Sequence, residues 1–193
     1  MSKELEIEFR NMITAEEYQE LIESFGLKEA DFFEQTNYYF DTPAFALKEL
    51  HAALRIRARN NNYELTLKTP EKVGLLETTQ ILAPDQAEGI IAGSNIPVGQ
   101  IRDALAKLSI DHTELENFGS LQTIRAEKDY KNGLLVFDKN FYGNIADFDL
   151  EYEVADFEKG KKIFSNLLED YGIEENEAPN KVKRFYDHIY GNK

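Results

Sequence analysis

The sequence predicts an α+β fold in which eight antiparallel strands curl into a barrel and helices pack outside it. Eight segments show the alternation of polar and apolar residues that is typical of strands. They fall into two groups of about four, and each group is followed by segments with helical spacing. A sheet of about eight strands can close on itself, so a closed or nearly closed barrel is the expected architecture.

The first group of strands lies in the first half of the chain. These strands are expected over residues 4–10, 32–40, 52–59, 62–69 and 75–82. Between the first two, Thr14 followed by Glu17 forms a capping box and predicts a helix to about Phe25. Pro43 suits the first position of a short helix to about Leu50.

The second half of the chain alternates between helical and strand patterns. Helices are expected near 84–92 and 97–108, each after an alanine–proline or isoleucine–proline pair. The remaining segments are strands over 118–129, 133–142 and 146–155, and helices over 157–171 and 179–190. No repeat or flexible linker interrupts them, so residues 1–193 are expected to form a single domain.

Composition excludes several classes of protein. A net charge of −14 argues against a surface that binds nucleic acid or an anionic membrane. The chain has no apolar run long enough for a membrane-spanning helix and no signal-peptide pattern, so a cytoplasmic location is expected. It has no cysteine and only three scattered histidines, which leaves carboxylates as the ligands for any metal ion.

Charged residues alternate along several predicted strands, so each set points to one face of the sheet. The first and last strands carry acidic sets, which are Glu4, Glu6 and Glu8 with Arg10, and Asp149, Glu151 and Glu153. The strand between them carries Arg55, Arg57 and Arg59. Four of the seven arginines, or five with Arg59, lie at such strand positions. This segregation indicates a local positive site in an acidic protein.

A curled sheet would bring these charged faces together on its concave side. Carboxylates bind hard divalent cations through oxygen, and arginine forks bind phosphate oxygens in pairs. Together they favour a metal–polyphosphate ligand, whose charge the cations would neutralise.

An ordered series of motifs resembles the CYTH domain family, also called the triphosphate tunnel metalloenzymes. Glu6-Ile7-Glu8-Phe9-Arg10 is similar to the family's Glu-x-Glu-x-Lys signature, and Tyr39-Phe40-Asp41-Thr42 to its Tyr-Phe-Asp-Thr segment. The strands Leu54-Arg55-Ile56-Arg57, Glu64-Leu65-Thr66-Leu67-Lys68 and Leu150-Glu151-Tyr152-Glu153 also match in order. The resemblance spans about residues 4–154 and is strongest to members from Gram-positive bacteria.

The resemblance implies hydrolysis of a triphosphate substrate with Mg²⁺ or Mn²⁺ in the barrel. The substrate would be inorganic tripolyphosphate, a nucleoside triphosphate or thiamine triphosphate. By position, the metal ligands would be Glu6, Glu8, Asp138, Glu151 and Glu153. The phosphate ligands would be Arg10, Arg55, Arg57, Lys68, Arg125 and Lys181. Of these, Glu6, Glu8, Arg57 and Lys68 are the expected catalytic residues.

Two departures from the family pattern keep other functions open. Arg10 replaces the usual lysine of the first motif, and Thr123 stands where several hydrolysing members carry a lysine. An adenylate cyclase that forms cyclic AMP and pyrophosphate is one alternative, and a non-catalytic triphosphate sensor is another. The chain is expected to work as a monomer or homodimer.

Overall fold

A computed structural model describes residues 2–176 and 178–191 of the chain. Within these residues the strands are β1 (Ser2–Ile13), β2 (Phe32–Asp41), β3 (Ala53–Arg59), β4 (Asn62–Pro70), β5 (Leu75–Leu82), β6 (Glu116–Tyr130), β7 (Gly133–Tyr142) and β8 (Ile145–Val154). The α-helices are α1 (Ala15–Ser24), α2 (Ala46–Glu49), α3 (Pro84–Ile91), α4 (Gln100–Lys107), α5 (Phe157–Asp170) and α6 (Lys181–Tyr190). Two short 3₁₀ helices, η1 (Glu29–Asp31) and η2 (His112–Glu114), precede β2 and β6.

The strands hydrogen-bond in the order β1-β5-β4-β3-β2-β6-β7-β8, which forms a closed barrel. The predicted α+β barrel is therefore confirmed. The chain divides into two compact units. The first contains the start of β1 and residues 35–121, and the second contains residues 6–34 and the chain from residue 122 onward.

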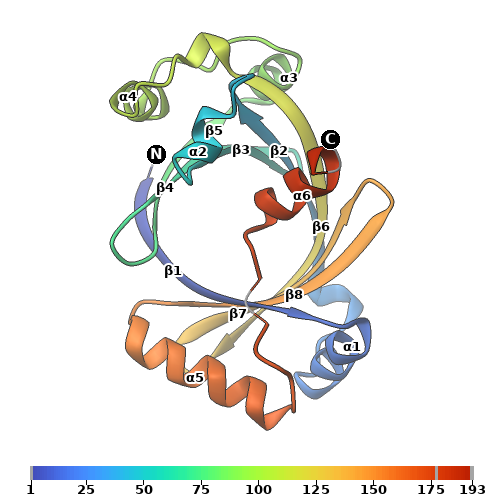
Figure 1. Cartoon of the computed structure of the whole chain (residues 1–193). Helices are drawn as coiled ribbons and strands as arrows, with labels where there is room; N and C mark the ends of the chain where they lie inside the picture. The colour runs from blue at the N-terminus through green and yellow to red at the C-terminus, as the bar shows by residue number, and fades with distance from the viewer. Residues whose placement is uncertain (1, 177, 192–193) are drawn as a thin grey trace. The chain divides into compact units, whose positions relative to one another are not determined.

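The first unit has its core between one face of β3 and β4 and the helices that follow β5. Leu54 and Ile56 of β3 and Leu65 and Leu67 of β4 are buried there. They pack in one apolar cluster with residues of α3 and α4, the two helices drawn in green and yellow-green in Figure 1. Since alternate residues of a strand point to opposite faces, the arginines of β3 lie on the other face.

The second unit has its core between β7 and β8 on one side and α1 and α5 on the other (Figure 1). Phe137, Leu150 and Tyr152 are fully buried in it. Gly160 lets α5 approach the sheet closely, because an added Cβ would lie 2.5 Å from a methyl carbon of Val154. The acidic residues of β7 and β8 occupy the opposite face of these strands.

The predicted elements all occur, with shifts at their ends. Thr14 and Glu17 form the predicted capping box, with hydrogen bonds of 3.1 and 2.7 Å to each other's backbone N–H. The predicted start of the short helix at Pro43 is wrong, because α2 begins only at Ala46. The side chain of Asp41 instead accepts hydrogen bonds from the backbone N–H groups of Thr42 and Leu47, which fixes this helix.

None of the helices in the described part of the chain combines the length and the apolar character that crossing a membrane requires.

Candidate functional site

The first unit presents a set of cations on the face of β3 and β4 that lies opposite its core. We call this set, with the two carboxylates beside it, the cation face; it consists of Arg55, Arg57, Arg59 and Lys68 with Glu64 and Glu77. Strand pairing sets its register, because Arg57 lies opposite Glu64 and Lys68 lies opposite Glu77. This face thus carries four cations and two carboxylates.

The contacts of the cation face leave hydrogen-bonding capacity on Arg55. Lys68 Nζ lies 2.5 Å from Glu77 Oε1, whereas Arg55 Nη2 lies 4.0 Å from the same oxygen. Within the described residues, Arg55 Nε is buried and has no hydrogen-bond acceptor. Arg57 Nε donates to Asn37 Oδ1 at 3.4 Å. A buried guanidinium nitrogen without an acceptor is costly, so an anionic ligand would stabilise this face.

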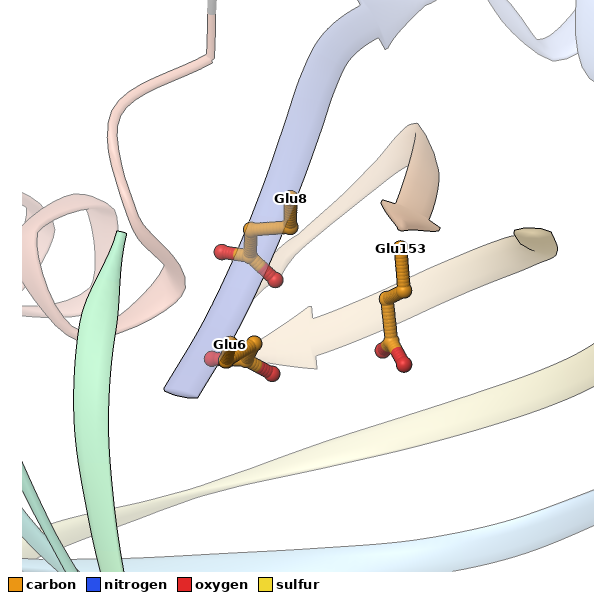
Figure 2. A group of neighbouring side chains, drawn as sticks. All are labelled: Glu6, Glu8 and Glu153. Atoms are coloured by element: carbon orange, nitrogen blue, oxygen red, sulfur yellow. The ribbon is translucent and has the colours of Figure 1, made fainter. Parts of the chain in front are cut away.

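The second unit brings three glutamates together, and we call them the glutamate triad. Glu6 and Glu8 come from β1, and Glu153 comes from β8, where it lies opposite Glu8 in the register. One carboxylate oxygen from each lies within 4.8 Å of the other two. Figure 2 shows the three carboxylates on neighbouring strands, with Glu6 and Glu8 on one strand and Glu153 beside them.

Glu153 has an unusual affinity for protons. Burial, together with the negative charges of Glu6, Glu151 and Glu8 and against a lowering effect of Arg125, raises its pKa to about 7. A raised carboxyl pKa means that the ionised form lacks compensating charge. A divalent cation would supply that charge, since oxygen ligands of this kind suit Mg²⁺, Mn²⁺ and Ca²⁺.

A second group of carboxylates in the same unit is surrounded by cations instead. We call it the buried network; it consists of Asp138, Asp149 and Glu151 with Arg10, Arg125, Lys181 and Arg184. Its three carboxylates are at most 2% exposed. Their oxygens also lie within 4.8 Å of one another, as in the glutamate triad.

Strand register and α6 together build the buried network. Arg10 lies opposite Glu151, and Arg125 lies opposite Asp138, so these pairs form directly across the sheet. Lys181, the first residue of α6, places Nζ 2.6 Å from Asp149 and 2.5 Å from Glu151. Asn180 caps this helix by accepting a hydrogen bond from the backbone N–H of Lys183, which fixes the turn that carries Lys181.

Charge neighbours set the pKa values of the network carboxylates in different directions. Burial alone would raise the pKa of Glu151, but Arg10, Lys181 and Arg125 outweigh it and hold that pKa well below its usual range. Burial is likewise outweighed at Asp138, where Arg125 and Lys181 lower the pKa. At Asp149 burial prevails and the pKa is raised, because Glu151 and Asp138 oppose the effect of Lys181.

The structure therefore separates the eleven residues predicted for the site into three groups. Arg55, Arg57 and Lys68 belong to the cation face of the first unit. Glu6, Glu8 and Glu153 form the glutamate triad of the second unit. Asp138, Glu151, Arg10, Arg125 and Lys181 belong to the buried network, in which each one faces an oppositely charged partner.

Sequence reasoning missed two members of the network. Asp149 was placed on the charged face of its strand but not in the site, although it lies two residues before Glu151 and thus on the same face. Arg184 follows Lys181 by three residues, which is the spacing that puts two side chains on one side of a helix. Arg184 Nη2 lies 2.8 Å from Asp149 Oδ1.

The two acidic groups differ in their fitness for a metal ion. The buried network has four cations beside its three carboxylates, and Lys181 Nζ lies within 2.8 Å of an oxygen of each carboxylate. An ammonium at that position competes with a metal ion. The glutamate triad is only partly buried, and its member Glu8 pairs with Arg10. Its three carboxylate oxygen donors lie close enough together to fit a divalent cation.

Comparison with protein families and curated proteins shows what the chain is similar to. The model of the "CYTH domain" family matches residues 4–186. A curated relative named "Putative triphosphatase YjbK", from Bacillus subtilis (strain 168), is 47% identical over 187 residues, which cover 97% of each chain.

Solved structures share the fold. A protein from Bacillus halodurans, described as a "putative adenylate cyclase", superposes with a TM-score of 0.93 at 37% identity and covers 96% of this chain and 100% of its own. The protein HpAC1 from Hippeastrum superposes with a TM-score of 0.78 at 23% identity, over 95% of this chain and 96% of its own. The second likeness concerns the fold alone.

Proposed function

The chain belongs to the CYTH domain family, and from this premise we propose that it hydrolyses a triphosphate-containing substrate with the help of a divalent metal ion. The observation that carries the proposal is the segregation of charge. The cation face has more cations than carboxylates, and the glutamate triad has a surplus of carboxylates. Phosphate oxygens suit the cation face, and a divalent metal ion suits the glutamate triad, and a triphosphatase that works with a metal ion uses both kinds of ligand. The relative YjbK, whose name refers to a triphosphatase, supports the reaction type.

We assign roles to the residues by their chemistry. Arg55, Arg57 and Lys68 bind phosphate oxygens and stabilise the charge that builds on them as a phosphoanhydride bond breaks. The glutamate triad holds Mg²⁺ or Mn²⁺. Such a cation, when bound, neutralises phosphate charge and makes a water molecule easier to deprotonate. Glu6 and Glu8 thus act by orienting the cation, and Arg57 and Lys68 act on the reacting phosphate itself.

The buried network has a different role in the proposal. The role of Asp138 and Glu151 as metal ligands stays a prediction. The same holds for the role of Arg10, Arg125 and Lys181 as phosphate ligands. Each already has a charged partner at short distance, so a ligand would have to displace an ion pair. We assign the network to holding β1, β6, β7, β8 and α6 together, so that the glutamate triad keeps its geometry.

The remaining expectations complete the proposal. Residues 1–193 act as one domain, since the family model spans residues 4–186 and so crosses the boundary between the two compact units. The protein works in the cytoplasm as a monomer or homodimer, on a small molecule rather than a nucleic acid. A formal charge of −14 supports the last point, because nucleic acid would be repelled.

Phosphate release tests the proposal. Purified protein is incubated with tripolyphosphate or ATP and with Mg²⁺, Mn²⁺ or chelator, and orthophosphate, pyrophosphate and cyclic AMP are measured. We expect the release of orthophosphate to require the metal ion. In Glu6→Gln the rate of release should fall at least about 100-fold, because the triad loses a charged ligand. Glu20→Gln, an exposed glutamate of α1, is the matched control and should keep full activity.

Other outcomes would contradict the proposal in distinct ways. Pyrophosphate with cyclic AMP would identify a cyclase. Binding of tripolyphosphate in calorimetry without any product would identify a sensor. Equal activity of Glu6→Gln and Glu20→Gln would remove the glutamate triad from the reaction.

A further inference from the structure

The first unit contains a pocket at the end of the cation face where β3 turns into β4. It has a volume of about 360 Å³ and is lined by Arg57, Arg59, Asn60, Asn62 and Glu64. This volume lies at the lower end of the range for small-molecule sites, roughly 300–1,000 Å³. The pocket is therefore large enough for more than a single phosphate group.

A tight hairpin builds the pocket. The β3 and β4 strands are joined at Asn60 and Asn61, whose φ angles of 48° and 61° are those of the left-handed region. Asparagine tolerates this region well, and two such residues in succession are typical of a two-residue hairpin turn. The side chain of Asn62 donates to the carbonyl of Asn60 at 3.2 Å, which ties the turn together. The lining residues thus sit on a defined backbone.

The pocket adjoins the cations to which we assign the phosphates. Arg57 lines the pocket and also belongs to the row that continues to Arg55. Alternate residues along a strand are about 7 Å apart, so Arg55, Arg57 and Arg59 form a continuous track. A triphosphate on Arg55 and Arg57 would direct whatever is attached to it toward Arg59 and the hairpin.

The chemistry of the lining indicates what is attached. Glu64 is half-buried and lies opposite Arg57, and within the described residues its side chain makes no hydrogen bond or ion pair. An ionised carboxylate only accepts hydrogen bonds, so it repels a further phosphate and attracts an O–H or N–H donor. Asn60 and Asn62 carry amides that can both donate and accept. Arg57 and Arg59 of the same lining attract the phosphate end of a ligand. Next to them, Glu64 and the two amides suit a polar organic group attached to that phosphate better than a further phosphate.

We propose that this pocket binds the hydrogen-bond-donating organic group of an organic triphosphate, with Glu64 as the residue that selects it over inorganic tripolyphosphate. The inference rests on the proposed function, since it concerns the same substrate. Ribose hydroxyls and base amino groups of a nucleoside triphosphate have this chemistry, and so does the aminopyrimidine of thiamine triphosphate. Substrate comparison distinguishes these sources.

The test compares wild type, Glu64→Ala and Glu64→Gln with ATP, GTP, thiamine triphosphate and tripolyphosphate in the presence of Mg²⁺. Both kcat/KM and the binding constant from calorimetry are measured. We expect Glu64→Ala to lower kcat/KM and affinity about tenfold for the organic triphosphate that fits, since one charge-assisted hydrogen bond is lost. For tripolyphosphate both values should rise, because a repulsive charge is removed. Glu64→Gln should lie between the two for the organic substrate.

A matched control and the contrary outcomes complete the design. Glu88→Gln, which alters an exposed glutamate of α3 in the same unit, should leave kcat/KM and affinity unchanged for all four substrates. If Glu64→Ala lowers the values for tripolyphosphate and organic triphosphates by the same factor, or changes neither, the inference is overturned while the proposed function stands. If wild type neither binds nor hydrolyses any of the four, the proposed function fails together with the inference.

Discussion

The cation face and the buried network contain the same number of cations but differ in the carboxylates around them. The cation face contains four cations and two carboxylates, Glu64 and Glu77. In the buried network four cations face Asp138, Asp149 and Glu151, with Glu8 and Asp147 at its edges. The arginines of the buried network thus serve the fold, whereas Arg55 of the cation face has a buried Nε without an acceptor in the described residues and can serve a ligand.

Desolvation explains why this difference matters. A buried ion pair has lost its water, so its members are strongly destabilised if one partner is removed. A half-buried cation with an incomplete set of partners keeps part of its water and gains from binding an anion. Loss of a residue should therefore affect stability in the network and substrate affinity on the cation face.

The largest expected effect is on stability, in Glu151→Gln. Glu151 pairs with Arg10 at 2.5 Å, Lys181 at 2.5 Å and Arg125 at 3.1 Å. Removing its charge leaves buried cations without compensation, and we expect a loss of about 3–5 kcal/mol in the free energy of unfolding. Urea denaturation measures it. Asp187→Asn, which breaks the exposed pair with Lys183, is the control and should cost less than about 1 kcal/mol.

Equal losses in Glu151→Gln and Asp187→Asn would show that the network does not hold the fold.

The next effect is on activity, in Arg55→Ala. Because Arg55 Nε is buried without an acceptor in the described residues, its removal should leave the free energy of unfolding within about 1 kcal/mol. We expect kcat/KM for the triphosphate to fall about 100-fold, as when a charged transition-state contact is lost. Steady-state phosphate release and urea denaturation measure the two quantities. Lys107→Ala, which removes an exposed cation of α4, should change neither quantity. If Arg55→Ala lost stability without losing activity, Arg55 would serve the fold and not the substrate.

A smaller effect concerns pH, through two glutamates of β8 whose pKa values shift in opposite directions. Glu151 is held ionised by its cations, whereas the pKa of Glu153 is raised to about 7. A metal ion must displace the proton of Glu153, so metal affinity should weaken as the pH falls below 7, by up to about tenfold per pH unit. Mn²⁺ titration by calorimetry between pH 5.5 and about 8 measures this dependence.

Glu153→Gln should bind Mn²⁺ more weakly and lose the pH dependence near 7. In the metal-free protein, the raised pKa of Glu153 adds to the free energy of unfolding at pH values below the ordinary glutamate pKa. This contribution is lost as the pH rises through about 7. An unchanged pH profile in Glu153→Gln would assign the titration to another group.

The smallest effect is expected in Thr123→Val. Thr123 is fully buried, and its hydroxyl donates to Asn140 Oδ1 at 2.8 Å. Asn140 in turn donates to Asp149, so Thr123 supports the edge of the buried network. We expect a loss of about 1 kcal/mol in the free energy of unfolding and activity within twofold of wild type. A large loss of activity with unchanged stability would place Thr123 in the reaction instead.

Local sequence patterns predicted most of the fold. Alternation along each strand identified the charged and apolar faces, because the side-chain period of a strand is fixed at two residues. The capping box at Thr14 and the asparagine turn after Arg59 marked element ends through local hydrogen bonding and backbone preference. The start of α2 escaped prediction because Asp41 caps it from a distance of six residues.

Local sequence patterns could not predict which charged residues lie next to one another across the sheet. Glu6, Glu8, Glu151 and Glu153 look alike in sequence, yet Glu151 lies among cations and the other three lie together. Register decides part of this, since it sets Glu8 opposite Glu153 and Arg10 opposite Glu151. The rest depends on α6, which brings Lys181 to Asp149 and Glu151 from 30 or more residues away.

The sequence by itself determined the strand faces, the helices and the kinds of charge that the site uses, because these follow from neighbours along the chain. Only the tertiary structure decided which carboxylates are neutralised and which keep their charge for a ligand. The physical reason is that electrostatic energy depends on distance and burial in space. Glu151 and Glu153 are two positions apart in the chain, and the cations around them give the two side chains different chemistry.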